Sequence, residues 1–312
     1  MTAAGLHAPA ARGVAATDPA IRIAGDGRSQ QLPATRVVRT RAELQHARQA
    51  LSGRVVLVPT MGALHEGHRS LIQAAHRLGD HVVVSIFVNP TQFGPGEDLD
   101  RYPRTPQADL DMCADEGAAM VFMPDSEQMY GPRLGIRVDP GELGGRLEGA
   151  VRPGHFAGVM TVVAKLFGLV KPHAAIFGEK DYQQLVLIRA ITRELVLGVE
   201  VYGLPTVREI DGLALSSRNA YLDQHQRAVA QALSRALRAG VAAAGHGPSA
   251  VLSAAQAVLD TEPELHVDYL AITDPDLGPA PDTGPARLLV AARLGTTRLI
   301  DNLPVTLGVT HV

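Results

Sequence analysis

Two short polar segments, far apart in the chain, carry residue types suited to binding a polyphosphate. The first spans residues 59–68 and reads PTMGALHEGH, and the second spans residues 215–219 and reads LSSRN. The first follows an apolar run, residues 55–58, and precedes a stretch with helical periodicity. This order predicts a strand, a tight turn and a helix N-terminus, where exposed N–H groups and the helix dipole favour an anion.

The side chains of the first segment fit the same chemistry. Gly62 and Gly67 let the backbone approach a ligand closely. His65 and His68 lie three residues apart, on one face of a helical turn, where they could hold a triphosphate while charge builds on a leaving pyrophosphate. Zinc is a less favoured alternative because HEGH is one residue short of the i, i+4 ligand spacing of zinc proteases. A plain surface turn also stays open.

A third polar segment, residues 178–181 (GEKD), follows another short apolar run. Lys180 could act as a point charge on a phosphate, and Asp181 could accept hydrogen bonds from ribose hydroxyls. Gly178 would permit close approach of the ligand. The alternative is a solvated charged turn, but the position after a predicted strand favours the functional interpretation.

The remaining candidates give weaker signals when taken alone. Ser216, Ser217 and Arg218 supply two hydroxyls and a forked guanidinium, which suit a polyphosphate but are equally common in turns. Gln92 and Gln184 are neutral amides that could donate to a hydroxy acid without pairing it too tightly. Most glutamines at such positions are simply solvated.

Three further residues have plain structural interpretations. Asp109 lies in the first turn of a predicted helix and most simply stabilises its dipole; a role near magnesium is the minority hypothesis. His155 could cap or pack at the start of a long apolar helix. Cys113 lies in a predicted helix, where packing is the simpler role, and a single cysteine cannot form an internal disulfide.

Apolar runs alternate with helical patterns from about residue 37 to residue 205, which predicts a doubly wound parallel sheet of the α/β class. Strands are expected at residues 55–58, 82–88, 120–123, 174–177 and 199–203, and helices at residues 68–78, 106–116, 158–170 and 182–195. Ligands bind at the carboxyl ends of the strands in such sheets. Three polar loops that follow strands should therefore converge on one crevice. They are the loop with His65 and His68, residues 89–93 and residues 178–181.

The chain divides into three expected parts. Residues 1–34 are rich in Ala, Gly, Pro and Thr and are expected to form a disordered extension. Residues 35–206 should form the parallel-sheet domain. Residues 207–312 should form a smaller α+β domain, with helices near 223–239 and 248–260 and strands near 267–272, 287–294 and 297–301.

The composition of the 312 residues limits the possible partners. The formal net charge is −3, which argues against a broad basic surface for nucleic acid. No apolar run approaches the roughly 18 residues of a membrane span. These features and the single cysteine favour a soluble protein of the cytoplasm.

Six motifs in order resemble the pantothenate synthetase (pantoate–β-alanine ligase) family of coenzyme A biosynthesis. The resemblance covers roughly residues 37–307. The motifs are residues 59–68 (PTMGALHEGH), 87–93 (FVNPTQF), 102–105 (YPRT), 152–156 (RPGHF), 177–184 (FGEKDYQQ) and 215–219 (LSSRN). The family is similar in turn to class I aminoacyl-tRNA synthetases, whose HIGH-type turn corresponds to His65–His68.

The resemblance implies an ATP-dependent condensation of (R)-pantoate with β-alanine through a pantoyl adenylate, with release of AMP and pyrophosphate. It also implies ATP and magnesium as co-reactants, a Rossmann-type N-terminal domain, a small C-terminal lid domain and a homodimer. Leu215 is one departure, because many members carry Met there. The apolar character is kept, so a modest effect is expected.

The resemblance assigns roles to individual residues. Its catalytic residues would be His65, His68, Lys180 and Arg218. Pantoate would be bound by Met61, Gln92 and Gln184. ATP would be bound by Pro59, Thr60, Met61, Gly67, His68, Gly178, Lys180, Asp181, Val207, Ser216, Ser217 and Arg218.

Two rival functions stay open at this stage. An adenylyltransferase that acts on a phosphate-bearing acceptor would need a basic acceptor pocket, which the pair Gln92 and Gln184 argues against. A non-catalytic ATP-binding protein could keep the fold, although intact His65, His68 and Lys180 speak against the loss of activity.

Overall fold

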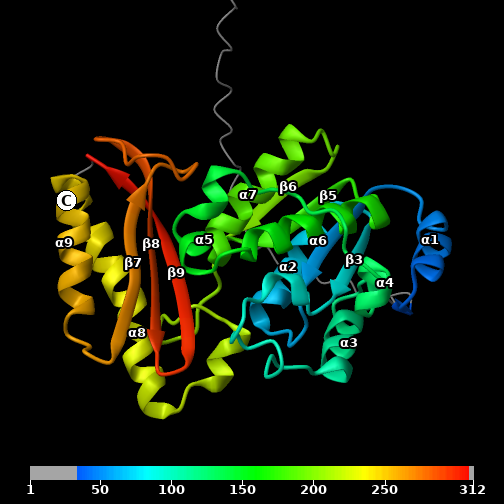
Figure 1. The fold of residues 1–312 in the computed structure, drawn as a ribbon, viewed down its shortest axis with the longest axis horizontal. Coiled ribbons are helices and arrows are strands. Elements are labelled where there is room, and N and C mark those ends of the chain that lie inside the picture. Colours follow the sequence, from blue (N-terminus) through cyan, green and yellow to red (C-terminus); the bar gives the residue numbers. More distant parts are fainter. Residues whose placement is uncertain (1–33, 309–312) are drawn as a thin grey trace, which may run out of the picture. The chain divides into compact units, whose positions relative to one another are not determined.

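The computed structural model describes residues 34–308, and its main feature is a six-stranded parallel sheet in the order β1-β4-β3-β2-β5-β6 (Figure 1). The strands are β1 Arg36–Val38, β2 Val55–Thr60, β3 His81–Ile86, β4 Met120–Phe122, β5 Ala174–Gly178 and β6 Glu200–Leu204. The predicted doubly wound α/β fold is confirmed. β1 is an additional edge strand, and the expected N-terminal extension lies, but for its last residue, outside the described residues.

Helices connect the strands and cover both faces of the sheet. They are α1 Arg41–Gln49, α2 Glu66–Ala75, α3 Pro106–Asp115, α4 Ser126–Tyr130, α5 Glu148–Val151, α6 His155–Val170 and α7 Tyr182–Glu194. Alternate residues of β2 serve the two cores: Val55 and Leu57 pack with α1, α6 and α7, whereas Val56 and Val58 pack with α2 and α3. This double burial explains why the strands read as continuous apolar runs.

Cys113 belongs to the second of these cores, and burial raises the pKa of its thiol to about 12. A thiol with so high a pKa is unreactive near neutral pH. The structure thus gives Cys113 a packing role.

The strand order reverses beside β2. From β2 the chain runs outward through β3 and β4, and later it returns to the other side of β2 as β5 and continues to β6. Loops that leave β2 and β5 turn toward opposite faces at such a switch point. A crevice therefore opens at the carboxyl ends of these two strands.

The C-terminal part of the chain has a separate core. An antiparallel sheet of β7 Leu265–Thr273, β8 Gly284–Leu294 and β9 Thr297–Leu307 packs against α8 Gln224–Ala242 and α9 Pro248–Leu259. β9 continues beyond the predicted residues 297–301, through Pro304. It can do so because β9 is an edge strand paired only with β8, and an edge strand tolerates a proline, which has no N–H donor.

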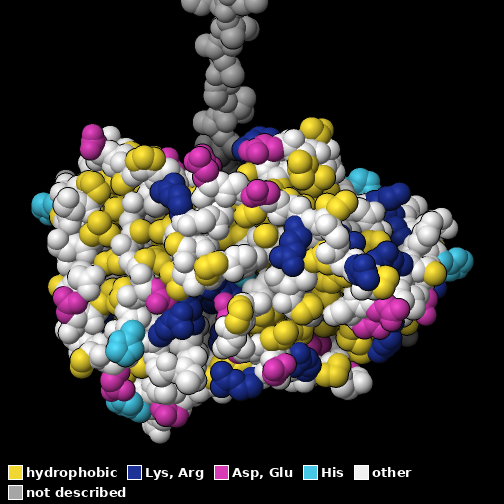
Figure 2. Space-filling model, viewed as in Figure 1, with side chains coloured by type: hydrophobic (Ala, Val, Ile, Leu, Met, Phe, Trp, Pro, Cys, Tyr) yellow, Lys and Arg dark blue, Asp and Glu magenta, His cyan; other side chains and the backbone are white. Residues whose placement is uncertain are grey.

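The face of the molecule drawn in Figure 2 mixes acidic, basic and apolar side chains. The charges of both signs are interspersed, in agreement with the nearly balanced composition. No helix within residues 34–308 is long and apolar enough to cross a membrane.

Candidate active site

A cleft of about 220 Å³ lies at the carboxyl ends of β2 and β5, where the strand order reverses. Its walls come from the turns after β2, β3 and β5, from α6 and from the loop before α8. Gly62 and Asp109 do not line it, but it brings together every residue to which the resemblance assigns a role. These are Pro59, Thr60, Met61, His65, Gly67, His68, Gln92, Gly178, Lys180, Asp181, Gln184, Val207, Ser216, Ser217 and Arg218.

The turn after β2 is built around Gly62 and a buried carboxylate. Gly62 adopts φ +83°, a conformation that L side chains rarely adopt. The Asp109 carboxylate then accepts hydrogen bonds from the N–H groups of Ala63 (3.0 Å) and Leu64 (2.8 Å). These contacts fix the turn that leads into α2.

The same contacts correct the minority hypothesis that Asp109 lies near magnesium. Its side chain is 2% exposed, it also accepts a hydrogen bond from the Thr105 hydroxyl, and it does not line the cleft. Its carboxylate oxygens are already used by protein donors. Within residues 34–308, no group of three or more His, Cys, Asp or Glu side chains could hold a metal ion.

His65 and His68 cap the N-terminus of α2 with their own rings. The Gly67 N–H donates to His65 Nδ1, and the His65 N–H donates to His68 Nδ1, both over 3.2 Å. A neutral imidazole that accepts at Nδ1 carries its proton at Nε2. Both residues therefore have an Nε2–H donor left for a ligand in the cleft.

Both imidazoles are neutral at physiological pH in this structure. Burial and the nearby positive charge of Lys180 lower the pKa of His65 to about 4, and burial and His65 lower that of His68 to about 3. The two neutral imidazoles can therefore donate hydrogen bonds to a ligand but add no positive charge of their own.

Another part of the cleft lining centres on the Gln92 amide, at the end of the turn after β3. Asn89 is 1% exposed and donates to Gln92 Oε1 over 2.9 Å, so the Gln92 NH₂ group faces the cleft beside the sulfur of Met61. The His155 ring contacts the Gln92 carbonyl at 2.8 Å. Gln92 is thus held by Asn89 at the N-cap of its own turn and by His155 of α6.

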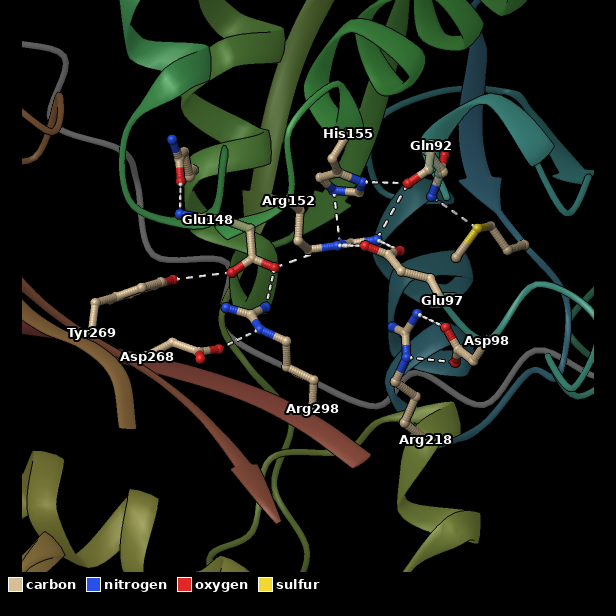
Figure 3. A network of polar contacts seen from close by, with 12 residues as sticks. Gln92, Glu97, Asp98, Glu148, Arg152, His155, Arg218, Asp268, Tyr269 and Arg298 are labelled. Carbon is tan, nitrogen blue, oxygen red and sulfur yellow. Dashed lines mark hydrogen bonds and ion pairs between the residues drawn. The ribbon is translucent and has the colours of Figure 1, made fainter. Parts of the chain in front are cut away.

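Figure 3 shows the network of ion pairs near Gln92. Arg152 donates to both carboxylate oxygens of Glu97, over 2.6 and 2.9 Å, and to His155 Nε2 over 3.1 Å. It also reaches the buried Glu148, which pairs in turn with Arg298 of β9. The network links the cleft to the C-terminal sheet.

Two further cations that line the cleft, Arg218 and Lys180, differ in their partners. Arg218 is bound by Asp98 in a two-pronged pair of 2.8 and 2.9 Å. Lys180 forms no ion pair within the part of the chain that the structure describes, so its ammonium is available to a ligand.

Sequence reasoning missed several residues that shape the cleft. Asn89, Tyr102 and Arg152 line it, and an apolar wall comes from Val159, Val162, Val163 and Leu166 of α6. Asn89, Tyr102 and Arg152 do lie within the quoted motifs, which was the available signal. Glu97 and Asp98 gave no such signal in the sequence, because their partners Arg152 and Arg218 lie 55 and 120 residues away.

Comparison with known proteins decides what this cleft belongs to. Residues 35–304 match the family model described as pantoate-beta-alanine ligase. The chain belongs to the pantoate–β-alanine ligase family. It is accordingly an ATP-dependent ligase that joins pantoate to β-alanine.

Individual relatives agree with the family match. The chain is 58% identical to a pantothenate synthetase of Saccharopolyspora erythraea, over 86% of this chain and 89% of the relative. It superimposes on a pantothenate synthetase of Thermus thermophilus with TM-score 0.82 at 50% identity, over 86% of this chain and 99% of the other. A Francisella tularensis ligase, solved with beta-gamma ATP and β-alanine, gives TM-score 0.74 at 33% identity over 86% and 97%.

The environment of His155 predicts a loss of stability in mild acid. Burial, with the adjacent Arg152 guanidinium, lowers the pKa of His155 from 6.5 to about 4, although Glu97 and Glu148 oppose this. Between pH 6.5 and 4, His155 is protonated in the unfolded chain but stays neutral in the folded chain. The free energy of unfolding therefore falls as the pH drops through this window, by up to about 3 kcal/mol for a shift of this size.

Urea unfolding of the wild type and of His155→Gln at several pH values tests this. Glutamine can keep a donor near the Gln92 carbonyl but does not titrate, so the variant should lose less stability than the wild type between pH 6.5 and 4. The comparison cancels groups common to both proteins. Parallel pH profiles would contradict the assignment.

Proposed function

We propose that the cleft makes pantothenate in two steps, through a pantoyl adenylate. The support is that two sets of side chains with different chemistry line one cavity. Lys180, Arg218 and the N-terminus of α2 suit a triphosphate, whereas Gln92 and Gln184 beside the apolar wall of α6 suit a small branched hydroxy acid. An enzyme with a phosphate-bearing acceptor would need an unpaired cation beside Gln92, whereas the cation there, Arg152, is paired with Glu97.

In the first step, a pantoate carboxylate oxygen attacks the α-phosphorus of ATP. The new O–P bond forms as the bond to the β-phosphate oxygen breaks, and pyrophosphate leaves with that electron pair. Both reactants are anions, so the approach is repelled unless cations lie nearby. Lys180 and Arg218 supply positive charge, and the two Nε2–H groups and the helix end supply donors to the departing pyrophosphate.

Arg218 reaches this role by a change of partner. It is held by Asp98 in the structure described here, and a phosphate in the cleft would compete with that carboxylate for the same planar donors. Asp98 thus keeps the guanidinium near the cleft and compensates its charge before ATP arrives.

In the second step, the β-alanine amine attacks the acyl carbon and loses a proton, and AMP leaves with the C–O electron pair. Water must be kept from the adenylate meanwhile. We propose that residues 207–312 serve as the lid domain and residues 35–206 as the substrate domain. The separate C-terminal core and the position of Ser216–Arg218 at the cleft support this division.

We further propose that magnesium enters on the ATP phosphates, since Asp109 is committed to the turn after β2. The enzyme is proposed to act as a cytoplasmic homodimer. β6 is an edge strand, and Val196 just before it is 85% exposed, which supports an interface at this edge. The mass of the enzyme in solution tests the dimer.

The order of the two steps gives the main test of the proposal. The enzyme should exchange labelled pyrophosphate into ATP when pantoate is present and β-alanine is omitted, because the first step is complete before the amine is needed. Lys180→Ala should abolish most of this exchange, whereas Lys171→Ala, an exposed lysine at the end of α6, should not.

Three other outcomes would each exclude the proposal in a distinct way. Exchange that strictly requires β-alanine would indicate a concerted reaction. Release of ADP in place of exchange would indicate attack at the γ-phosphate. A protein that binds ATP but shows neither reaction would not be an active ligase.

The neutral imidazole of His68 predicts different results for two substitutions. His68→Gln places an amide donor near the former Nε2, whereas His68→Asn keeps an acceptor near Nδ1 and removes the donor to the cleft. We expect His68→Asn to lower kcat by about a hundredfold, the range for one lost donor to developing charge, and His68→Gln to lower it much less. Equal losses in kcat would contradict the donor role.

Gln184 is expected to select pantoate. Gln184→Glu replaces a donor with a negative charge beside the substrate carboxylate or hydroxyl, so the pantoate KM should rise about tenfold or more with little change in the ATP KM. Steady-state kinetics with each substrate varied measures both constants. Gln73→Glu, at an exposed position of α2, is the control for the added charge. Equal effects on the two constants would remove Gln184 from the pantoate pocket.

A further inference from the structure

The turn that carries Lys180 is held in place by a residue of the C-terminal sheet. The Asn302 side chain, on β9, donates from Nδ2 to the carbonyl oxygens of Glu179 and Lys180, both over 2.9 Å. Asn302 is 3% exposed, so water does not replace these contacts easily. One amide thus satisfies two successive carbonyls more than 120 residues away in sequence.

The Asn302 amide is itself fixed by a neighbour on β8. Arg287 donates from Nε to Asn302 Oδ1 over 2.7 Å, and from Nη2 to Glu179 Oε2 over 2.8 Å. Its guanidinium lies 3.8 Å from the ring centroid of Tyr182. Because Oδ1 faces a donor, the NH₂ group must face the two carbonyls.

The turn is short and has little side-chain support from its own residues. Glu179–Asp181 is a single 3₁₀ turn without a side-chain hydrogen bond at its N-cap, between the end of β5 and the start of α7. Lysine has a long flexible side chain, so the direction of its ammonium depends on how well its backbone is held. Fixing two carbonyls of the turn fixes the backbone position from which the Lys180 side chain extends.

We propose that Asn302 is a positioning residue for Lys180. It acts through the backbone of the Glu179–Asp181 turn and makes phosphate binding depend on the docking of the C-terminal sheet. This inference rests on the role of Lys180 in the proposed function, and Asn302 itself touches no substrate.

The direct test is Asn302→Asp, which keeps the size and the acceptor to Arg287 but turns a carboxylate oxygen toward the two carbonyls. We expect kcat/KM for ATP to fall about tenfold or more, with the pantoate KM within about twofold of the wild type. Asn302→Ala, which removes the donors without adding charge, should show a smaller loss in the same direction.

Val305→Ala is the matched control for lost stability. Val305 lies three residues farther along β9, so its side chain is on the opposite face, buried in the C-terminal core away from the turn. It should lower the urea midpoint without a selective change in kcat/KM for ATP. If the Asn302 variants lose activity only as far as Val305→Ala does at equal stability, Asn302 is merely structural and the proposal is wrong.

A double-mutant cycle with Lys180→Ala tests the route of the effect. If Asn302 acts through Lys180, then adding Asn302→Asp to the Lys180→Ala variant should lower the rate of AMP formation at low ATP only slightly further. Independent, multiplicative losses would overturn the inference. If Lys180→Ala alone leaves the rate unchanged, the proposed function of Lys180 fails instead, and the two failures are thereby distinguished.

Discussion

The cleft depends on one topological constraint, the reversal of strand order beside β2. Neighbouring strands of a sheet lie about 4.8 Å apart, so the turns after β2 and β5 must emerge side by side. One turn ends in the helix N-terminus with His65 and His68, and the other carries Lys180. Two chain segments far apart in sequence are therefore close enough to supply donors to a single anion.

The electrostatics of the cleft follow from its partial burial. Positive charge without compensation would be costly there, and the structure avoids that cost in two ways. Arg218 and Arg152 are paired with Asp98 and Glu97, and the imidazoles stay neutral. The cleft therefore offers strong donors before the ligand arrives but little uncompensated positive charge apart from Lys180. Anionic substrates gain by exchanging water for donors that are already in position.

The fold class and the convergence of the loops could be predicted because they depend on local patterns. Apolar runs, helical periods and polar segments after strands were enough to place His65, Lys180 and Gln92 at one edge of the sheet. β1 was missed because it has only three residues and is partly exposed. The residues that orient the site could not be predicted in this way. Asp109 holds the turn after β2, and Asn302 holds the turn after β5, through contacts that depend on tertiary packing and that sequence periodicity does not encode.

The links between the two sheets use arginine, of which the chain has 26 against three lysines. Arg298 binds Glu148, and Arg287 binds Glu179, with both arginines mostly buried. Separating the sheets would break both pairs and, at the same time, the buried hydrogen bonds from Asn302 to the Lys180 turn, so these contacts together oppose a rigid-body opening. The Asp98–Arg218 pair lies at the cleft and is more exposed, and it can exchange a carboxylate for a phosphate. Within the proposed lid domain, residues 207–312, we therefore expect the Ser216–Arg218 loop to move on closure while β9 stays docked to the Lys180 turn.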